Sequence, residues 1–188
     1  MRARGFILQA SYRIHGGVPV VHLYGRFESG ATFLVRDHRQ HPHFYIGAAH
    51  AVRARDVAAV EPIASARTDF GGRAVCRVDA AVPQDVPALR DALHAAGIDT
   101  YEADVRFATR LLIDLDIKGG CEIDGEPTKG ATIDWIFDDP VLQSADVTLR
   151  PCVLSFDIET DAKATQLLAI SLYGCGVDEV LVVDPAQR

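Results

Sequence analysis

The chain lacks any long apolar run, and this absence limits where it can reside. None of the apolar stretches in its 188 residues approaches the roughly 18 residues that a membrane-spanning helix requires. Residues 1–5 lead directly into a strand-like segment and contain no apolar signal core. We therefore expect a cytoplasmic protein with no membrane partner. The sequence also has no internal repeat and no low-complexity segment.

Cysteine motifs are absent as well. The four cysteines, Cys76, Cys121, Cys152 and Cys175, form no Cys-x-x-Cys pair, which argues against a zinc ribbon or a redox motif. In a reducing compartment we expect all four to be buried free thiols. Glycine pairs at 71–72 and 119–120 lack the context of a phosphate-binding loop and predict turns instead.

The formal net charge of −7 is unevenly distributed along the chain. Residues 1–60 contain eight arginines against three acids, residues 61–110 contain six against eight, and residues 111–188 contain five basic groups against fifteen acids. The arginine-rich front could contact phosphates, whereas the acidic rear would repel nucleic acid unless cations lie between them. A solvated surface is the alternative explanation for such an excess of charge.

With 48% apolar residues, the chain can form a substantial core, in one large domain or two small ones. Its first ninety residues are mainly β in pattern, with turns at 15–17 and 69–72 that predict hairpins. The predicted strands of this part are 6–14, 18–24, 32–36, 43–46, 63–67 and 74–78.

Three helices are predicted, over 50–60, 86–96 and 107–114. The second has the clearest signals, with Asp85 as N-cap, Pro87 in the first turn and Gly97 after its end. Its expected buried stripe is Val86, Leu89, Leu93 and Ala96. Two further short strands are expected at 98–102 and 132–137. The stretch 118–129 is rich in glycine and acids and predicts a connector, with a domain boundary within 118–150.

The most informative stretch is 153–160, where Asp157 and Glu159 lie two residues apart in an apolar, strand-like run. Successive side chains of a strand point to opposite faces, so both carboxylates project from one face. Like charges this close repel unless a cation lies between them, and paired carboxylates suit magnesium. Two such ions about 4 Å apart can clamp the attacking and leaving oxygens during phosphodiester hydrolysis. We therefore interpret the pair as half of a two-metal nuclease site.

A solvated strand face is the alternative for this pair, because Asp-x-Glu arises by chance in an acidic protein. The context favours a site. A second apolar run, 166–173, follows a short polar turn at 161–165, which is the layout of a hairpin. No lysine or arginine lies within the acid-bearing strand.

A histidine cluster and an aromatic pair are the other candidates for binding. His38, His41 and His43 are possible zinc ligands, but no cysteine or acid follows at a ligand-like spacing, and residues 37–40 predict a polar loop. Trp135 and Phe137 could stack on bases, although an aromatic pair in an apolar strand more often belongs to a core.

Two segments together resemble the family B DNA polymerases. Residues 83–90, leading to 101–114, look like the close of the family's amino-terminal domain. Phe156-Asp157-Ile158-Glu159-Thr160 looks like the first motif of the family's 3′→5′ proofreading exonuclease. The order and spacing of the segments fit, and residues 5–8 and 101–106 look most like the bacterial branch, DNA polymerase II. The resemblance spans nearly the whole chain.

The resemblance implies an α+β fold in two parts. Residues 1–130 would form a mixed, largely antiparallel β amino-terminal domain. Residues 131–188 would be a connector and the first strands of a truncated ribonuclease-H-like exonuclease domain. In the family, palm, fingers and thumb follow, so the chain would be an amino-terminal fragment. The polymerase carboxylates and the later exonuclease motifs are absent from the sequence, so we expect the isolated fragment to be inactive.

For the parent protein, the resemblance implies templated DNA synthesis with proofreading, in DNA replication and repair. Asp157 would bridge two magnesium ions and Glu159 would hold one of them near the terminal phosphodiester. The implied partners are a DNA primer-template, deoxynucleotides and a sliding clamp. Two hypotheses compete with this one. A stand-alone metal-dependent nuclease would need further acids in motifs beyond Thr160, and a non-catalytic nucleic-acid-binding or protein-binding module would not need the acid pair.

In archaeal relatives, the family's amino-terminal domain holds a pocket that reads uracil in the template ahead of synthesis. The matching positions here are Tyr12, Pro42, His43, Val86, Val105, Phe107 and Arg110. The match is partial, because Arg106 stands where those relatives have proline, and His43 and Leu111 stand where they have tyrosine. A charged Arg106 at the mouth would alter a snug apolar slot, so we favour core and surface roles for these residues.

Overall fold

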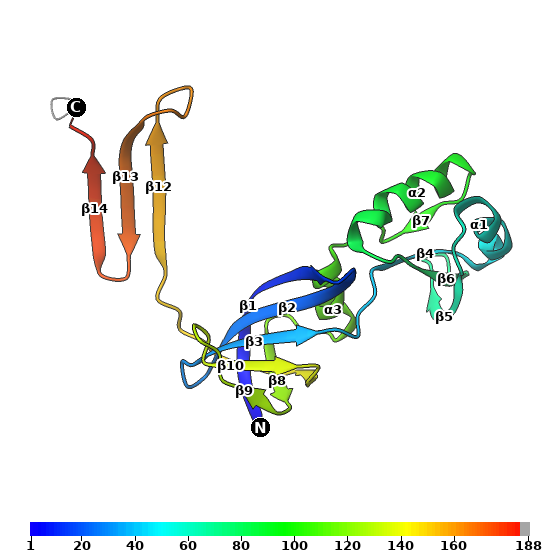
Figure 1. Ribbon diagram of the computed structural model, residues 1–188, viewed down its shortest axis with the longest axis horizontal. Coiled ribbons are helices and arrows are strands. Elements are labelled where there is room, and N and C mark those ends of the chain that lie inside the picture. The colour runs from blue at the N-terminus through cyan, green and yellow to red at the C-terminus, as the bar shows by residue number, and fades with distance from the viewer. Residues whose placement is uncertain (185–188) are drawn as a thin grey trace. The chain divides into compact units, whose positions relative to one another are not determined.

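The computed structural model describes residues 1–184 and divides into two compact units (Figure 1). The first unit is Met1–Thr148, and the second begins at Leu149. This division lies within the range 118–150 in which the sequence predicts a boundary. Residues 131–148, grouped above with the second part, belong to the first unit, because Trp135–Asp138 pairs with the strand Thr32–Asp37 and Val141–Ser144 pairs with the strand Gly120–Asp124.

The larger sheet of the first unit has seven strands in the order β11-β8-β1-β2-β3-β10-β9. Neighbouring strands are antiparallel except for β10 and β3, which are parallel. The strands are β1 (Arg2–His15), β2 (Val18–Phe27), β3 (Thr32–Asp37), β8 (Gly120–Asp124), β9 (Pro127–Thr128), β10 (Trp135–Asp138) and β11 (Val141–Ser144). Helix α3 (Phe107–Asp114) packs against this sheet, and its Phe107 and Leu111 join a core that includes Leu23 and Phe137.

A second sheet of four strands, in the order β5-β6-β4-β7, has its own core. Its strands are β4 (His43–Gly47), β5 (Ile63–Thr68), β6 (Ala74–Asp79) and β7 (Thr100–Tyr101). It is accompanied by helices α1 (Ala51–Ala58) and α2 (Val86–Ala95) and by the short 3₁₀ turns η1 (Ala48–His50) and η2 (Pro83–Asp85). Phe44, Ile46 and Val78 of the sheet pack with Leu93 of α2 and with Ile98.

The second unit is a three-stranded antiparallel sheet in the order β12-β13-β14. Its strands are β12 (Leu154–Thr160), β13 (Leu167–Gly174) and β14 (Val177–Val182). The expected hairpin of 153–173 is confirmed as β12 and β13.

Most of the local predictions are confirmed, including all three helices and the largely antiparallel β architecture. The α2 stripe packs into the core as expected, and Gly97 takes a positive φ of 70° after the helix. Asp85 precedes α2 but makes no side-chain capping bond, because the 3₁₀ turn η2 leads into the helix.

The connector expected at 118–129 is wrong, because β8 and β9 lie there. Strand β8 pairs with β1 through Arg2–Asp124 to Phe6–Gly120, and this buries Cys121 and Ile123 in the core. Pairing between residues so distant in sequence gives a glycine-rich acidic segment a strand conformation that its composition does not suggest.

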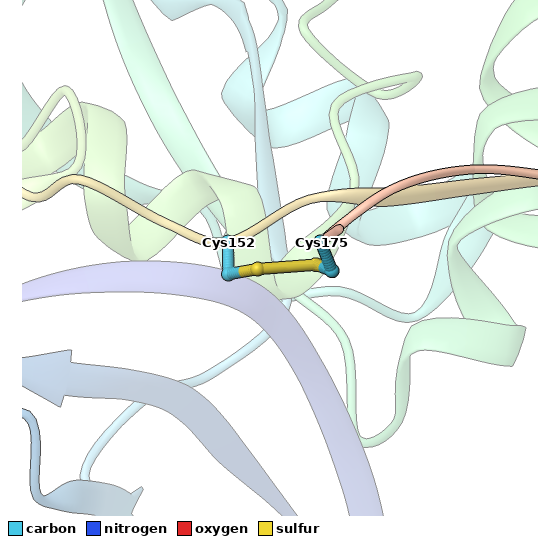
Figure 2. Close-up of a disulfide and its surroundings, with 2 residues drawn as sticks. All are labelled: Cys152 and Cys175. Carbon is cyan, nitrogen blue, oxygen red and sulfur yellow. A yellow bond between two sulfur atoms is a disulfide. The ribbon is translucent and has the colours of Figure 1, made fainter. Parts of the chain in front are cut away.

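The expectation of four free thiols is also wrong. Cys76 and Cys121 are free and buried, but Cys152 and Cys175 form a disulfide (Figure 2). Pairing of Leu154 with Gly174 in the β12–β13 ladder brings Cys152, two residues before β12, next to Cys175 in the turn after β13, with a Cα–Cα distance of 5.5 Å.

Among residues 1–184, no helix is long and apolar enough to cross a membrane.

The cysteine arrangement predicts a specific thiol count. In the unreduced native chain, a thiol reagent should label little, because Cys76 and Cys121 are buried and burial raises the pKa of the Cys121 thiol to about 12. Denaturation without reductant should expose these two thiols, and reduction should add Cys152 and Cys175. Mass spectrometry after alkylation measures each stage. Four reactive thiols before reduction would contradict the disulfide.

Two buried histidines predict a dependence of stability on pH. Burial is the main cause that lowers the pKa of His22 and of His43. A histidine with a lowered folded pKa contributes stability that is present above the unfolded pKa of about 6.5 and is lost as the pH falls through the folded pKa. We therefore expect the urea midpoint of the first unit to fall between about pH 7 and pH 5.

The matched variants for this experiment are His22→Gln and His50→Gln. With His22→Gln, the urea midpoint should fall less steeply as the pH is lowered. His50→Gln removes an exposed imidazole, so its midpoint should change with pH as that of wild type does. Equal slopes for all three proteins would show that the buried imidazole does not cause the pH dependence.

Candidate functional site

The acid pair lies on β12, the first strand of the second unit. Asp157 pairs with Ser171 of β13, and Glu159 pairs with Ala169. Because directly paired residues and alternate residues of a strand share a face, both carboxylates project from the same face of the sheet. Both side chains are exposed.

The two faces of this sheet differ in chemistry. The face of the acid pair also carries Ser155, Ala169, Ser171, Tyr173, Asp178, Val180 and Val182, so none of its described residues is basic. The opposite face carries Leu154, Phe156 and Ile158, which are 45%, 67% and 49% exposed. The acids therefore form a local concentration of negative charge with no cationic side chain beside them.

Asp178 of β14 shares the face of the acid pair, whereas Asp161 and Glu179 do not. The Asp161 carboxylate accepts bonds from the backbone N–H groups of Thr165 and Gln166, both at 2.7 Å, and the bond from Gln166 is the main cause of its lowered pKa. Asp161 therefore shapes the β12–β13 turn. Glu179 pairs with Leu172, on the face opposite the acid pair. Within residues 1–184, no group of three or more histidine, cysteine or acidic side chains is arranged to hold a metal.

The seven positions matched to the family's template pocket lie around one hollow of the first unit, which we call the template hollow. Its volume is about 430 Å³. The residues come from β1, from the start of β4, from α2 and from the segment that begins α3. They are Tyr12, Pro42, His43, Val86, Val105, Phe107 and Arg110. These residues are up to about a hundred positions apart in the sequence, and they come together because the two sheets of the first unit meet here.

Arg110 is the one charged group buried at this hollow, with a residue exposure of 3%. Its Nη1 donates to the Glu102 carboxylate at 2.6 Å, and its Nη2 donates to the Glu102 carbonyl at 3.4 Å. Its Nε has no hydrogen-bond partner among the described residues. The guanidinium is thus fixed on one side and retains an unused donor.

His43 adds a polar side chain to the lining and Tyr12 adds an aromatic one. The His43 Nδ1 lies 2.9 Å from the His41 carbonyl, so it carries the proton, and burial keeps the pKa of the ring low. The Tyr12 ring packs edge-on against Phe107, with 5.7 Å between ring centroids. The hollow therefore combines an aromatic wall with a neutral imidazole.

The three departures from the family's pattern differ in place, because His43 and Arg106 line the hollow and Leu111 does not. Arg106 is exposed and lines the hollow, so its charge lies at the opening as expected. Leu111 is 4% exposed, packs in the core beneath the large sheet and does not line the hollow.

The remaining candidates have structural partners. His38 lies beside the Asp139 carboxylate at 3.2 Å, and Asp37 of the same loop is buried and accepts a bond from the backbone of Arg39. Phe137 is fully buried in the core, as predicted, and Trp135 packs on that core with the Lys129 ammonium 3.6 Å from its ring centre.

Sequence reasoning missed Phe70, which is fully exposed at the tip of the β5–β6 hairpin. The sequence does contain a signal for this exposure. Phe70 lies in a turn between an aspartate and two glycines, so no neighbour in sequence can bury its ring.

Comparisons with known proteins agree with this picture. The chain is 36% identical over 142 residues to a DNA polymerase of Archaeoglobus fulgidus, in a match that covers 69% of the chain and 18% of that protein. It is 33% identical over 135 residues to a DNA polymerase of Thermococcus kodakarensis, with 64% of the chain and 8% of that protein covered. No family model matches the chain.

Among solved structures, the family B DNA polymerase of Pyrobaculum calidifontis matches 97% of the chain and 27% of its own length, with a TM-score of 0.70 and 26% identity. The chain thus spans a small fraction of the length of the proteins that it matches. Closeness to the bacterial branch stays a prediction. By sequence and by fold, the chain is homologous to the amino-terminal region of the family B DNA polymerases.

Proposed function

We propose that the chain is the amino-terminal portion of a DNA-directed DNA polymerase with 3′→5′ proofreading. The observation that carries this proposal is the acid pair on one exposed face of β12, without a basic neighbour, in a chain homologous to these polymerases. The partners would be a DNA primer-template, deoxynucleotides and a sliding clamp. The first unit would be the amino-terminal domain, and the second unit would begin a ribonuclease-H-like exonuclease domain.

The donor set of Asp157 and Glu159 fits magnesium, because hard divalent cations prefer carboxylate oxygens. Magnesium bound there would activate water and stabilise the charge that develops on the terminal phosphodiester. Asp157 and Glu159 themselves place two negative charges at fixed positions on β12. Two carboxylates cannot complete a two-metal cage, so other segments of a parent protein must supply the remaining ligands.

The test of this proposal uses a full-length parent protein. Replacing Asp157 and Glu159 together by alanine should lower 3′→5′ exonuclease activity by at least about a thousandfold, since metal and substrate charge stabilisation is a dominant catalytic effect. Templated synthesis should continue. Degradation of a 3′-labelled primer, with and without deoxynucleotides, measures both activities.

Glu179→Ala is the matched control, because it removes an acid from the same sheet on the opposite face. It should retain exonuclease activity. Wild-type proofreading by the Asp157/Glu159 double variant would refute the catalytic assignment and favour a binding module.

The isolated 188-residue chain should not degrade DNA. Incubated with magnesium or manganese and a labelled single strand, it should leave the strand intact, because its acid pair lacks partner ligands. Degradation that is abolished by the double variant would instead support the stand-alone nuclease.

A second proposed role concerns the template hollow. Its aromatic wall and its fixed Arg110 suit an unpaired nucleobase. We propose that it receives a template base, and that Arg106 at the opening weakens selection for uracil. Core and surface roles for the same residues are the alternative.

A pair of oligonucleotides that differ in one uracil or thymine tests this role. In a closely fitting apolar pocket a single methyl group is worth about 1–3 kcal/mol, so a selective pocket would prefer uracil by about tenfold or more. We expect a smaller preference in wild type and a larger one in Arg106→Ala. Fluorescence anisotropy gives both affinities. Equal affinities in both proteins would leave only the structural roles.

A further inference from the structure

A second hollow of the first unit, of about 410 Å³, lies beside the β5–β6 hairpin. We call it the hairpin pocket. It is lined by three aromatic side chains, Tyr45, Phe70 and Tyr101, together with Arg67 and Glu102. Tyr45 and Tyr101 are directly paired on β4 and β7, so their rings share the face of the four-stranded sheet that points away from its core.

Phe70 is held in an exposed position by a well-ordered turn. The Asp69 carboxylate accepts bonds from the backbone N–H groups of Gly71 at 2.8 Å and Arg73 at 2.9 Å, and from the Arg73 side chain at 2.7 Å. Gly72 supplies the positive φ of 77° that closes the turn. A fully exposed aromatic ring on such a turn loses little further freedom when it binds a ligand.

Arginines alternate with the aromatic residues on the same outer face. Arg77 is directly paired with Tyr45, and the Arg67 guanidinium lies 5.8 Å from the centre of the Tyr45 ring. Arg67 and Arg73 are 51% and 79% exposed, so their charges reach solvent. Aromatic rings interleaved with arginine are the composition of surfaces that bind single-stranded nucleic acid.

The acids of the hairpin pocket are neutralised within the protein. Asp69 is ion-paired with Arg73, and Glu102 is ion-paired with the buried Arg110. Their carboxylates therefore do not present uncompensated negative charge to a phosphate backbone. Arg67, Arg73 and Arg77 are in turn ion-paired with Asp114, Asp69 and Asp79, so the surface that remains for a ligand is mainly aromatic, with guanidinium groups at its edge.

The hairpin pocket is linked to the template hollow by contacts between their lining residues. Glu102 lines the former and fixes Arg110, which lines the latter. The Tyr45 and His43 rings, one from each hollow, meet edge to face with 5.7 Å between centroids. One strand of DNA can thus offer neighbouring bases to both hollows.

We infer that the hairpin pocket is a second base-binding subsite for single-stranded DNA, in which a base stacks on Phe70 and its phosphate lies near Arg67 and Arg73. The inference rests on the proposed DNA-handling role of the chain. Stacking accepts every base, so this subsite binds without sequence preference, beside the hollow that would select a base.

Fluorescence anisotropy of the 188-residue chain with a labelled mixed-sequence single strand tests the inference. Phe70→Leu keeps an apolar side chain but removes the ring, and it should weaken binding by about tenfold. Phe70→Tyr keeps a stacking ring and should bind as wild type does. Val52→Ala removes an apolar side chain that is 70% exposed on α1 of the same part of the unit, and it should have no effect.

A strand with a single 2-aminopurine separates stacking from other effects, because its fluorescence falls when the base stacks. The fall should occur with wild type and Phe70→Tyr and disappear with Phe70→Leu. Binding and quenching unchanged in Phe70→Leu would overturn the subsite while leaving the exonuclease proposal intact. An absence of binding by wild type would also overturn it and would favour a protein partner for Phe70. Loss of exonuclease in the Asp157/Glu159 variant is measured separately and does not depend on either outcome.

Discussion

The ion pair of Arg110 with Glu102 is the interaction on which the arrangement of the first unit's hollows depends. A buried guanidinium must find partners inside the protein, because an unpaired buried charge is strongly destabilising. Glu102 provides both its carboxylate and its carbonyl, and it does so with a positive φ of 61°. Such a conformation costs a non-glycine residue about 1–3 kcal/mol. The contacts with Arg110 offset this strain, because the bend between β7 and α3 places both Glu102 oxygens against the guanidinium. The same bend separates the two neighbouring hollows.

The acid pair of the second unit differs from Arg110 in its electrostatic environment. Asp157 and Glu159 are exposed, and no described residue forms an ion pair with either of them. In water the repulsion between them is small enough to be tolerated, so the fold does not need to compensate it. A site that must bind and release metal ions benefits from charge that the protein leaves uncompensated, whereas a site that must hold a fixed donor, such as Arg110, benefits from charge that is already paired.

How far the sequence predicts the structure depends on the distance over which each signal acts. Helix α2 was predictable because Pro87, Gly97 and the apolar spacing all act within a few residues. The strand β8 was not, because its conformation depends on Arg2 and its neighbours at the other end of the unit. The same-face placement of Asp157 and Glu159 followed from strand alternation alone.

Convergence of the seven template-hollow residues could not be derived from their spacing. It came only from the resemblance, since it requires both sheets and two helices to be in place. Phe70 shows the reverse case. The turn around Phe70 was predicted correctly, but Phe70 was interpreted only as part of that turn. Its proximity to Tyr45 and Tyr101 could not be predicted, because it arises from pairing between strands.

The disulfide between Cys152 and Cys175 has a consequence for the strand that follows it. In a two-stranded pairing, a slip of one residue turns every side chain to the other face, and exposed sheets with little core resist such slips weakly. A slip of β12 against β13 would move both carboxylates to the side now occupied by Phe156 and Ile158. A covalent bond between the entry of β12 and the exit of β13 fixes the alignment of the two strands at that end. The disulfide therefore determines which face of the sheet carries the two carboxylates.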